Sequence, residues 1–140
     1  MKILLSIAIL SLISVYMCEK NDSISTETIL GDWEVVSIIV DATQINQESD
    51  SDIIVIEFQS DGRLFGNSSR NMLTGRYELH QNDSIWISSI GGTEALGTKW
   101  EQSFKSVVQV VSRVRIMENS NLQLLSVNGK NKIEFKTTDQ

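Results

Sequence analysis

The sequence predicts a mainly β (α+β) domain: about eight antiparallel strands in a cracked or half-open barrel, with one amphipathic helix inserted between the fifth and sixth strands. Short segments rich in Val and Ile recur along the chain and are bounded by turn residues. None of the 140 residues is Pro, so nothing interrupts a strand. The apolar period changes once, near Trp100, from two residues to about 3.6.

Turn sequences separate the expected strands. Ser60-Asp61-Gly62 and Asn128-Gly129 lie between alternating apolar segments, and such pairs favour tight hairpins. A further turn is expected at residues 81–83, and glycines mark a loop before the helix. The expected strands are residues 31–40, 53–59, 63–67, 76–80, 85–87, 113–117, 122–127 and 132–136.

One segment, residues 98–111, has the period of a helix. Thr98 with Glu101 three positions later fits a capping box, in which the hydroxyl binds the amide of Glu101 and the carboxylate returns to the amide of Thr98. One apolar face is expected to pack on the sheet. It consists of Trp100, Phe104, Val107, Val108 and Val111.

The first residues predict export. Lys2 precedes an apolar run over residues 3–17, which is typical of a secretory signal peptide. The run is shorter than the roughly 20 residues that a membrane-spanning helix needs. We therefore expect residues 1–17 to be a signal peptide.

Cys18 follows this run and is the single Cys of the chain. It resembles the lipidation cysteine of bacterial lipoproteins, although Tyr16 and Met17 are bulkier than the residues usual before that cysteine. The alternative is an ordinary signal peptide that contains a Cys. We expect a lipidated Cys18 and a flexible tether over residues 18–28, and a β domain over 29–137. The expected location is the cell envelope, lipid-anchored at the outer membrane on its periplasmic or its surface-facing side.

Composition and motifs exclude several function classes. The net charge of −6, with no block of Lys or Arg, argues against a nucleic-acid partner. His80 is the single His and has no Cys or second His near it in sequence, so no zinc set is expected. No nucleophile elbow, phosphate loop or dinucleotide fingerprint occurs. We expect no catalytic residue, no metal and no cofactor, and we place His80 at the surface.

Four spaced residues, Gly66, Asn71, Gly75 and Tyr77, lie between two alternating segments. Together with Glu101 and Phe104 on the helix, and Leu122 and Leu124 after it, they make the segment from Ile56 to Phe135 resemble the META domain, or HslJ-like, family. The resemblance implies a compact antiparallel β fold with a packed helix. It also implies an envelope protein, often a lipoprotein tied to heat or envelope stress, without established catalytic residues.

Two positions depart from that family. Arg70 and Gly97 stand where the family commonly has cysteines, so no disulfide or redox role is carried over. We expect Asn71 to bridge backbone groups within its own loop.

A second resemblance competes with the first. Gly31 and Trp33 are similar to the opening of lipocalins, but lipocalins place their helix after the eighth strand. Two functions follow from these resemblances. One is a non-enzymatic envelope lipoprotein that binds an envelope protein, and the other is a carrier of a small apolar ligand. The carrier would hold its ligand in a cavity lined by Trp33, Phe58, Phe65 and Trp86, although we otherwise expect the three tryptophans in the core.

Overall fold

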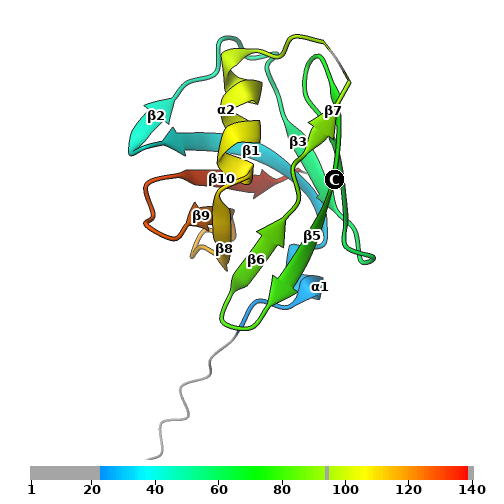
Figure 1. Cartoon of the computed structure of the whole chain (residues 1–140), viewed down its shortest axis with the longest axis vertical. Coiled ribbons are helices and arrows are strands. Elements are labelled where there is room, and N and C mark those ends of the chain that lie inside the picture. The colour runs from blue at the N-terminus through cyan, green and yellow to red at the C-terminus, as the bar shows by residue number, and fades with distance from the viewer. Residues whose placement is uncertain (1–22, 94, 139–140) are drawn as a thin grey trace, which may run out of the picture.

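In the part of the chain that the structure describes, ten strands form one antiparallel sheet, and eight of them close into a barrel (Figure 1). The computed structural model describes residues 23–93 and 95–138. The order around the barrel is β10-β9-β8-β6-β5-β4-β3-β1, and β1 pairs with β10 to complete the ring. The barrel strands are β1 (Gly31–Val40), β3 (Val55–Phe58), β4 (Arg63–Asn67), β5 (Met72–His80), β6 (Ser84–Ile87), β8 (Val111–Ile116), β9 (Leu122–Ser126) and β10 (Lys132–Thr137).

The mainly β fold class is confirmed, with one difference in the form of the barrel. The barrel is closed rather than half-open, because β1 and β10 pair from Trp33 to Ile39 on β1. The shortest strand pairing in the barrel is between β6 and β8, where Ser84 opposite Arg113 is the one paired position. The sequence did not predict closure, because no local sequence signal reports that the first and last strands are neighbours.

Two short strands that the sequence did not predict lie outside the ring. β2 (Thr43–Ile45) pairs with the second half of β1, and β7 (Gly91–Gly92) pairs with β5. The turn between β1 and β2 uses Asp41 and Ala42, both at positive φ. Because neither residue is Gly or Asn, this hairpin has no ordinary turn signal.

The expected helix is present but shorter than predicted: α2 spans Lys99–Val108, and Val111 begins β8 instead of lying on the helix. The side chain of Thr98 accepts a hydrogen bond from the amide of Glu101 at 3.2 Å, which confirms the first half of the capping box. Helix α2 packs on β1 and β10, and the Phe104 ring meets the Phe135 ring edge to face at 6.4 Å between centroids. Its buried face helps to fill one side of the core.

The segment before β1 lies against the barrel. A short helix, α1 (Thr26–Ile29), precedes β1, and the indole of Trp33 donates to the Ile29 carbonyl at 2.8 Å. The Ile24 amide donates to the Asp83 carboxylate at 2.8 Å, and the Ile24 side chain packs on the core. Residues 24–28, which we expected in the tether, therefore belong to the folded part.

Within the described residues, no helix is long and apolar enough to cross a membrane. The predicted signal peptide and Cys18 lie outside the residues that the structure describes.

Candidate functional site

The four signature residues lie on β4, β5 and the loop between them. Gly66 on β4 is opposite Leu73 on β5, and Gly75 is opposite Leu64, so the two glycines lie in the same ladder with one residue pair between them. A Cβ added to Gly66 would lie 2.3 Å from the Val55 carbonyl oxygen. Gly66 is therefore required by the close approach of β3 to β4.

Tyr77 has a structural role. Its ring is buried and meets the Phe58 ring edge to face at 5.1 Å between centroids. Its hydroxyl donates to the Gln59 carbonyl at 2.8 Å. Burial raises the pKa of Tyr77, and the nearby Asp61 carboxylate adds to that shift. The phenol therefore keeps its proton and fixes the turn that joins β3 to β4.

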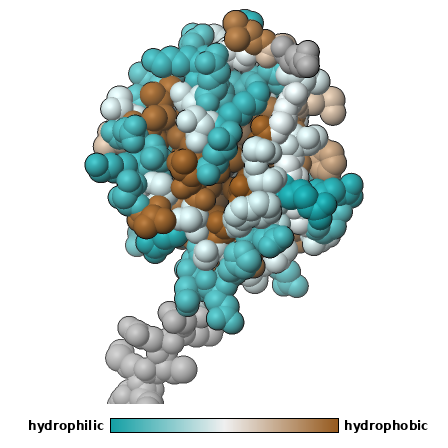
Figure 2. All heavy atoms as spheres, in the orientation of Figure 1, coloured by the Kyte–Doolittle hydropathy of each residue, from teal (hydrophilic) through white to brown (hydrophobic). Residues whose placement is uncertain are grey.

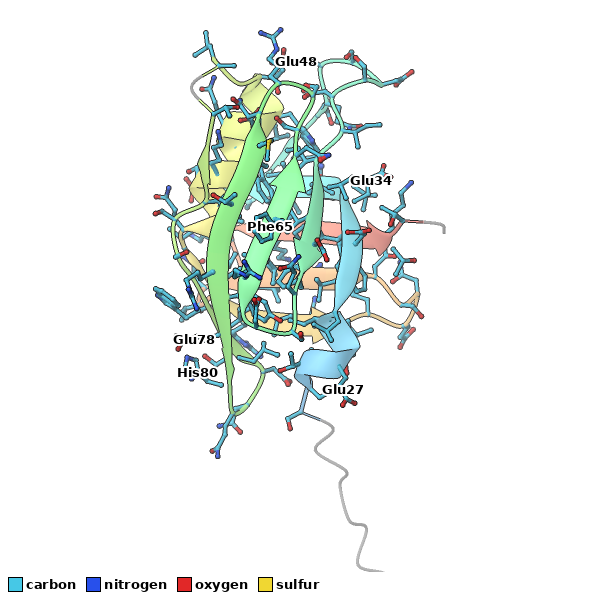
Figure 3. The ribbon with its side chains drawn as sticks, turned by 90° about the vertical axis from the view of Figure 1, so that its right-hand side faces the viewer. Glu27, Glu34, Glu48, Phe65, Glu78 and His80 are labelled. Carbon is cyan, nitrogen blue, oxygen red and sulfur yellow. The ribbon has the colours of Figure 1, made fainter. Side chains whose placement is uncertain are left out.

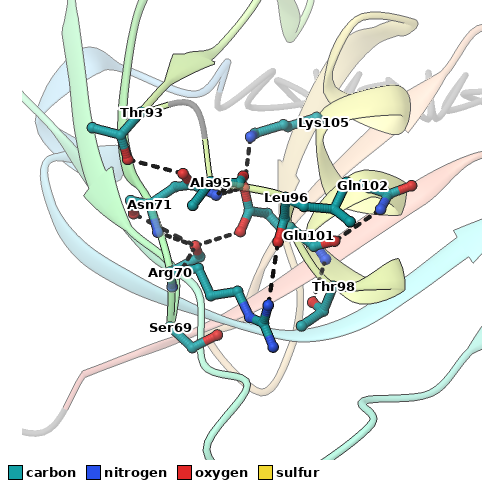
Figure 4. Close-up of polar contacts among 12 residues, drawn as sticks. Ser69, Arg70, Asn71, Thr93, Ala95, Leu96, Thr98, Glu101, Gln102 and Lys105 are labelled. Carbon is teal, nitrogen blue, oxygen red and sulfur yellow. Dashed lines mark hydrogen bonds and ion pairs between the residues drawn. The ribbon is translucent and has the colours of Figure 1, made fainter.

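Asn71 is the centre of a polar cluster that joins three parts of the chain (Figure 4). Its amide nitrogen donates to the Glu101 carboxylate at 2.7 Å and to the Ala95 carbonyl at 3.1 Å. Its amide oxygen accepts from the Thr93 hydroxyl at 2.8 Å. Asn71 thus bridges a neighbouring loop and helix α2, whereas we had expected bonds within its own loop.

Glu101 is fully buried and ionised. Its carboxylate accepts from Asn71 and from the Ser68 hydroxyl, and it forms an ion pair with Lys105 one helical turn later. These bonds replace the expected return bond to the Thr98 amide. We call these five residues the Glu101 network: Ser68, Asn71, Thr93, Glu101 and Lys105.

Burial by itself raises the pKa of Glu101, but the bonds from Lys105, Ser68 and Asn71 outweigh it and leave the pKa below its ordinary value of 4.5. A carboxylate that is ionised at neutral pH and shielded from water has no proton to give and no access to a substrate. The Glu101 network therefore holds the loops to the helix, and it has no catalytic geometry.

A second buried carboxylate lies beside the network. Asp52 is 2% exposed, and its Oδ1 accepts from the Thr98 hydroxyl at 3.0 Å and from the Ser69 hydroxyl at 3.2 Å. Its Oδ2 has no hydrogen-bond partner among the described residues. Sequence reasoning missed Asp52, because an acidic residue at the end of a polar loop looks like ordinary solvated sequence.

The positions of the missing family cysteines lie close together. The Arg70 guanidinium donates to the Leu96 carbonyl at 3.5 Å, directly before Gly97. A Cβ added to Gly97 would lie 2.8 Å from the carboxyl carbon of Glu101. In this chain a polar bond and a close approach to Glu101 join the two loops.

The four residues expected to line a ligand cavity do not surround one space. Trp33 and Phe58 are buried in the core. Trp86 is 51% exposed, and Phe65 is half-buried with the Arg63 guanidinium over its ring at 5.5 Å. Strand alternation puts the buried Ile85 and Ile87 inside, so Trp86 between them faces outward. The prediction that all three tryptophans lie in the core is therefore wrong for Trp86.

No group of three or more potential metal-binding side chains is present in the described part of the chain. His80 is exposed, as expected, and its Nε2 lies 3.9 Å from the Glu78 carboxylate. The chemistry available at these positions is hydrogen bonding, ion pairing and apolar contact.

The fold and its buried network define a class: a small closed antiparallel barrel in which one capped helix is tied to the loops by a buried carboxylate. Residues 26–139 match the META domain family, and the chain belongs to that family. The match extends beyond the segment from Ile56 to Phe135 on which the resemblance was first noted. The META domain is not a known enzymatic family.

Two solved structures share the fold. A DUF4847 family protein from Bacteroides vulgatus is 18% identical, with a TM-score of 0.59, and the match covers 81% of this chain and 96% of that one. A protein from Burkholderia xenovorans is 21% identical, with a TM-score of 0.64, and the match covers 82% of this chain and 87% of that one. No curated protein matches the sequence. At these identities the neighbours establish the fold alone.

Proposed function

We propose that this chain is a non-enzymatic lipoprotein of the cell envelope that binds a protein partner through the outside of its barrel. The observation that carries this proposal is the filled interior. Large side chains from both sides of the barrel and from α2 occupy the core, and they make edge-to-face aromatic contacts there. They include Trp33, Phe58, Tyr77, Trp100, Phe104 and Phe135.

A filled core argues against the carrier. A pocket for a small apolar ligand needs an enclosed volume lined by apolar side chains. The depressions described on this protein open to the surface, and Phe65 and Trp86 face outward. A ligand inside the barrel would have to displace close-packed side chains, which costs several kcal/mol.

The proposed anchor would keep the barrel near the membrane. Cys18 lies six residues before Ile24, whose amide is held by Asp83. Six residues span at most about 21 Å when fully extended. The end of the barrel where the N-terminal segment joins it would then lie next to the bilayer, and the N-terminal end of α2 would point away from it (Figure 1).

Radiolabelled palmitate incorporation tests the anchor. The wild-type chain is expressed in a bacterium that processes lipoproteins, and Cys18→Ala is compared with Ser23→Ala, a change in the same segment. We expect label and membrane fractionation for the wild type and Ser23→Ala, and neither for Cys18→Ala. Equal labelling of Cys18→Ala would overturn the anchor.

Trp fluorescence tests partner binding against the carrier. Trp33 is buried in the core, so a fatty acid that entered the barrel would change its emission. We expect no saturable change when palmitic acid is titrated into the full chain, with Trp33→Phe as the control for the origin of the signal. A saturable change that Trp33→Phe removes would contradict the proposal and restore the carrier.

A further inference from the structure

The outer face of β1, β3, β4 and β5 is an open sheet surface. Figure 3 shows these strands facing the viewer, with Phe65 near the middle and no helix in front of them. Each strand is paired on both sides: β1 with β10 and β3, β3 with β1 and β4, β4 with β3 and β5, and β5 with β4 and β6. A partner therefore cannot add a strand here and has to use side-chain contacts.

Outward side chains cross this face in two rows. In the first row Asp32 is opposite Glu57, and Glu57 is opposite Phe65. In the second row Val55 is opposite Asn67, and Asn67 is opposite Met72. We call these six residues the β3 trough: Asp32, Val55, Glu57, Phe65, Asn67 and Met72. They line one depression of about 350 Å³, to which Gly66 adds bare backbone.

The β3 trough combines apolar surface with negative charge. Met72 is 63% exposed, and Val55 and Phe65 are half-buried beside it. Asp32 and Glu57 are direct cross-strand neighbours, and like charges in that position repel. Among the described residues no Lys or Arg forms an ion pair with either carboxylate. A cation placed between them would relieve the repulsion.

Two cations of the strands that form or adjoin this face have other partners. Arg63 is ion-paired with Asp61 at 2.6 Å and lies over the Phe65 ring, and Lys136 is ion-paired with Glu34 at 3.3 Å. The contact of Arg63 also shows that the Phe65 ring accepts a cation over its face. Glu57 accepts one neutral hydrogen bond, from the side-chain amide of Gln59 at 3.1 Å, so a complementary positive charge is left for a partner to supply.

We propose that the β3 trough docks a protein segment in which Lys or Arg alternates with apolar side chains. The basic group would lie between Asp32 and Glu57, and an apolar neighbour would pack on Val55, Phe65 and Met72. A free amine supplies the charge without the apolar contact, so a peptide segment fits better. This inference rests on the proposed partner-binding function and assigns its surface and the chemistry of its partner.

Fluorescence anisotropy of a labelled peptide tests the docking. The probe is the capped peptide Val-Lys-Val-Lys-Val, titrated with the full chain in non-ionic detergent at low salt, because screening weakens exposed ion pairs. We expect saturable binding that the double variant Asp32→Asn, Glu57→Gln weakens about fivefold, in line with the small energy of each exposed ion pair. Phe65→Ala should weaken it as well. Glu78→Gln, which removes an exposed charge outside the trough, should leave it unchanged.

Each contrary result has a distinct meaning. Equal binding of the peptide by the double variant and the wild type, or no binding to the wild type, would overturn the site. Equal binding of Val-Glu-Val-Glu-Val would show that charge is not read, and competition by lysine amide at the peptide's own affinity would show an amine site rather than a docking surface. Circular dichroism verifies that the variants are folded. If the wild-type chain incorporates no palmitate, the proposed lipid anchor is refuted, but peptide binding at the β3 trough is not affected by that outcome.

Discussion

Glu101 holds a negative charge where water does not reach, and three donors from two parts of the chain surround it. Ionised groups are rarely buried without such partners, because removing a charge from water costs several kcal/mol. Ser68, Asn71 and Lys105 offset that cost. A single residue therefore links helix α2 to the loop that follows β4.

Replacing Glu101 should weaken the fold. Glu101→Gln keeps the size of the side chain but removes its charge, so Lys105 loses its ion pair. We expect the free energy of unfolding to fall by about 2 kcal/mol in urea denaturation. Glu78→Gln, an exposed carboxylate, should change it by less than about 0.5 kcal/mol. Equal midpoints for both variants would show that the network does not contribute.

The same residue should make stability depend on pH. The pKa of Glu101 is lowered in the folded protein, so the folded state holds the proton less tightly than the unfolded state. This contribution is fully present above the ordinary value of 4.5 and is lost as the pH falls through the lower, folded pKa. As the pH is lowered from 7 to 3, the urea midpoint of unfolding should decrease more steeply for the wild type than for Glu101→Gln. Parallel pH profiles would contradict the assignment.

At the scale of elements, helix α2 and the pair of strands β3 and β4 decide how the interior is filled. Helix α2 inserts Trp100, Phe104, Val107 and Val108, and β3 approaches β4 so closely that Gly66 has no room for a side chain. The sequence predicted part of each contact. The helical period predicted that α2 packs on the core, and the spaced glycines indicated an unusual backbone geometry around Gly66.

Truncating the helix core tests its docking. Phe104→Ala removes a buried ring that contacts Phe135, and we expect a loss of about 3–5 kcal/mol in the free energy of unfolding. Trp100→Ala should behave similarly. The matched control is Ser106→Ala, an exposed position on the same helix, with a change below about 0.5 kcal/mol. Unchanged urea midpoints for the two core variants would mean that the helix does not dock.

The close approach of β3 to β4 can be tested by replacing Gly66. Gly66→Ala would place a methyl group 2.3 Å from the Val55 carbonyl oxygen, so β3 and β4 would have to move apart. We expect a loss of about 1–3 kcal/mol in thermal or urea unfolding. Gly91→Ala is the control, because an added Cβ there meets nothing within 4 Å. A Gly66→Ala variant as stable as this control would refute the close approach.

At the scale of the whole molecule, the sequence predicts the barrel class, the helix and most strand positions, because each depends on local alternation and turn residues. It misses what depends on distant pairing. The bond from Asn71 to Glu101 spans 30 residues, and β1 meets β10 across nearly the whole domain. Trp86 is a different case, since the flanking Ile85 and Ile87 already indicated that it faces outward.

The candidate site was predicted in part. The spacing of Gly66, Asn71 and Tyr77 indicated a shaped connection, and the structure gives each of them a structural contact. Glu101 was expected to cap the helix, although its position three residues before Phe104 already placed it on the buried face. Asp52 and the β3 trough had no sequence signal, because both arise from strands or loops that meet only in the fold.

Closure of the barrel should depend on its last strand. Removing residues 132–140 deletes β10, leaves β1 and β9 without that neighbour, and takes Ile133 and Phe135 out of the core. We expect cooperative urea unfolding and the near-ultraviolet circular dichroism signal to disappear. Removing residues 139–140 alone serves as the control and should preserve both. A cooperative transition in the longer deletion would show that the ring tolerates a gap.

The pairing of β1 with β10 also determines when the barrel can close during synthesis. A ribosome delivers β1 early and β10 only at the end, so a nascent chain lacks its closing partner until translation has almost finished. Contacts between such distant segments form slowly. The chain therefore cannot adopt its closed form until its last strand has been synthesised, and the proposed export would act on a chain whose barrel is still open.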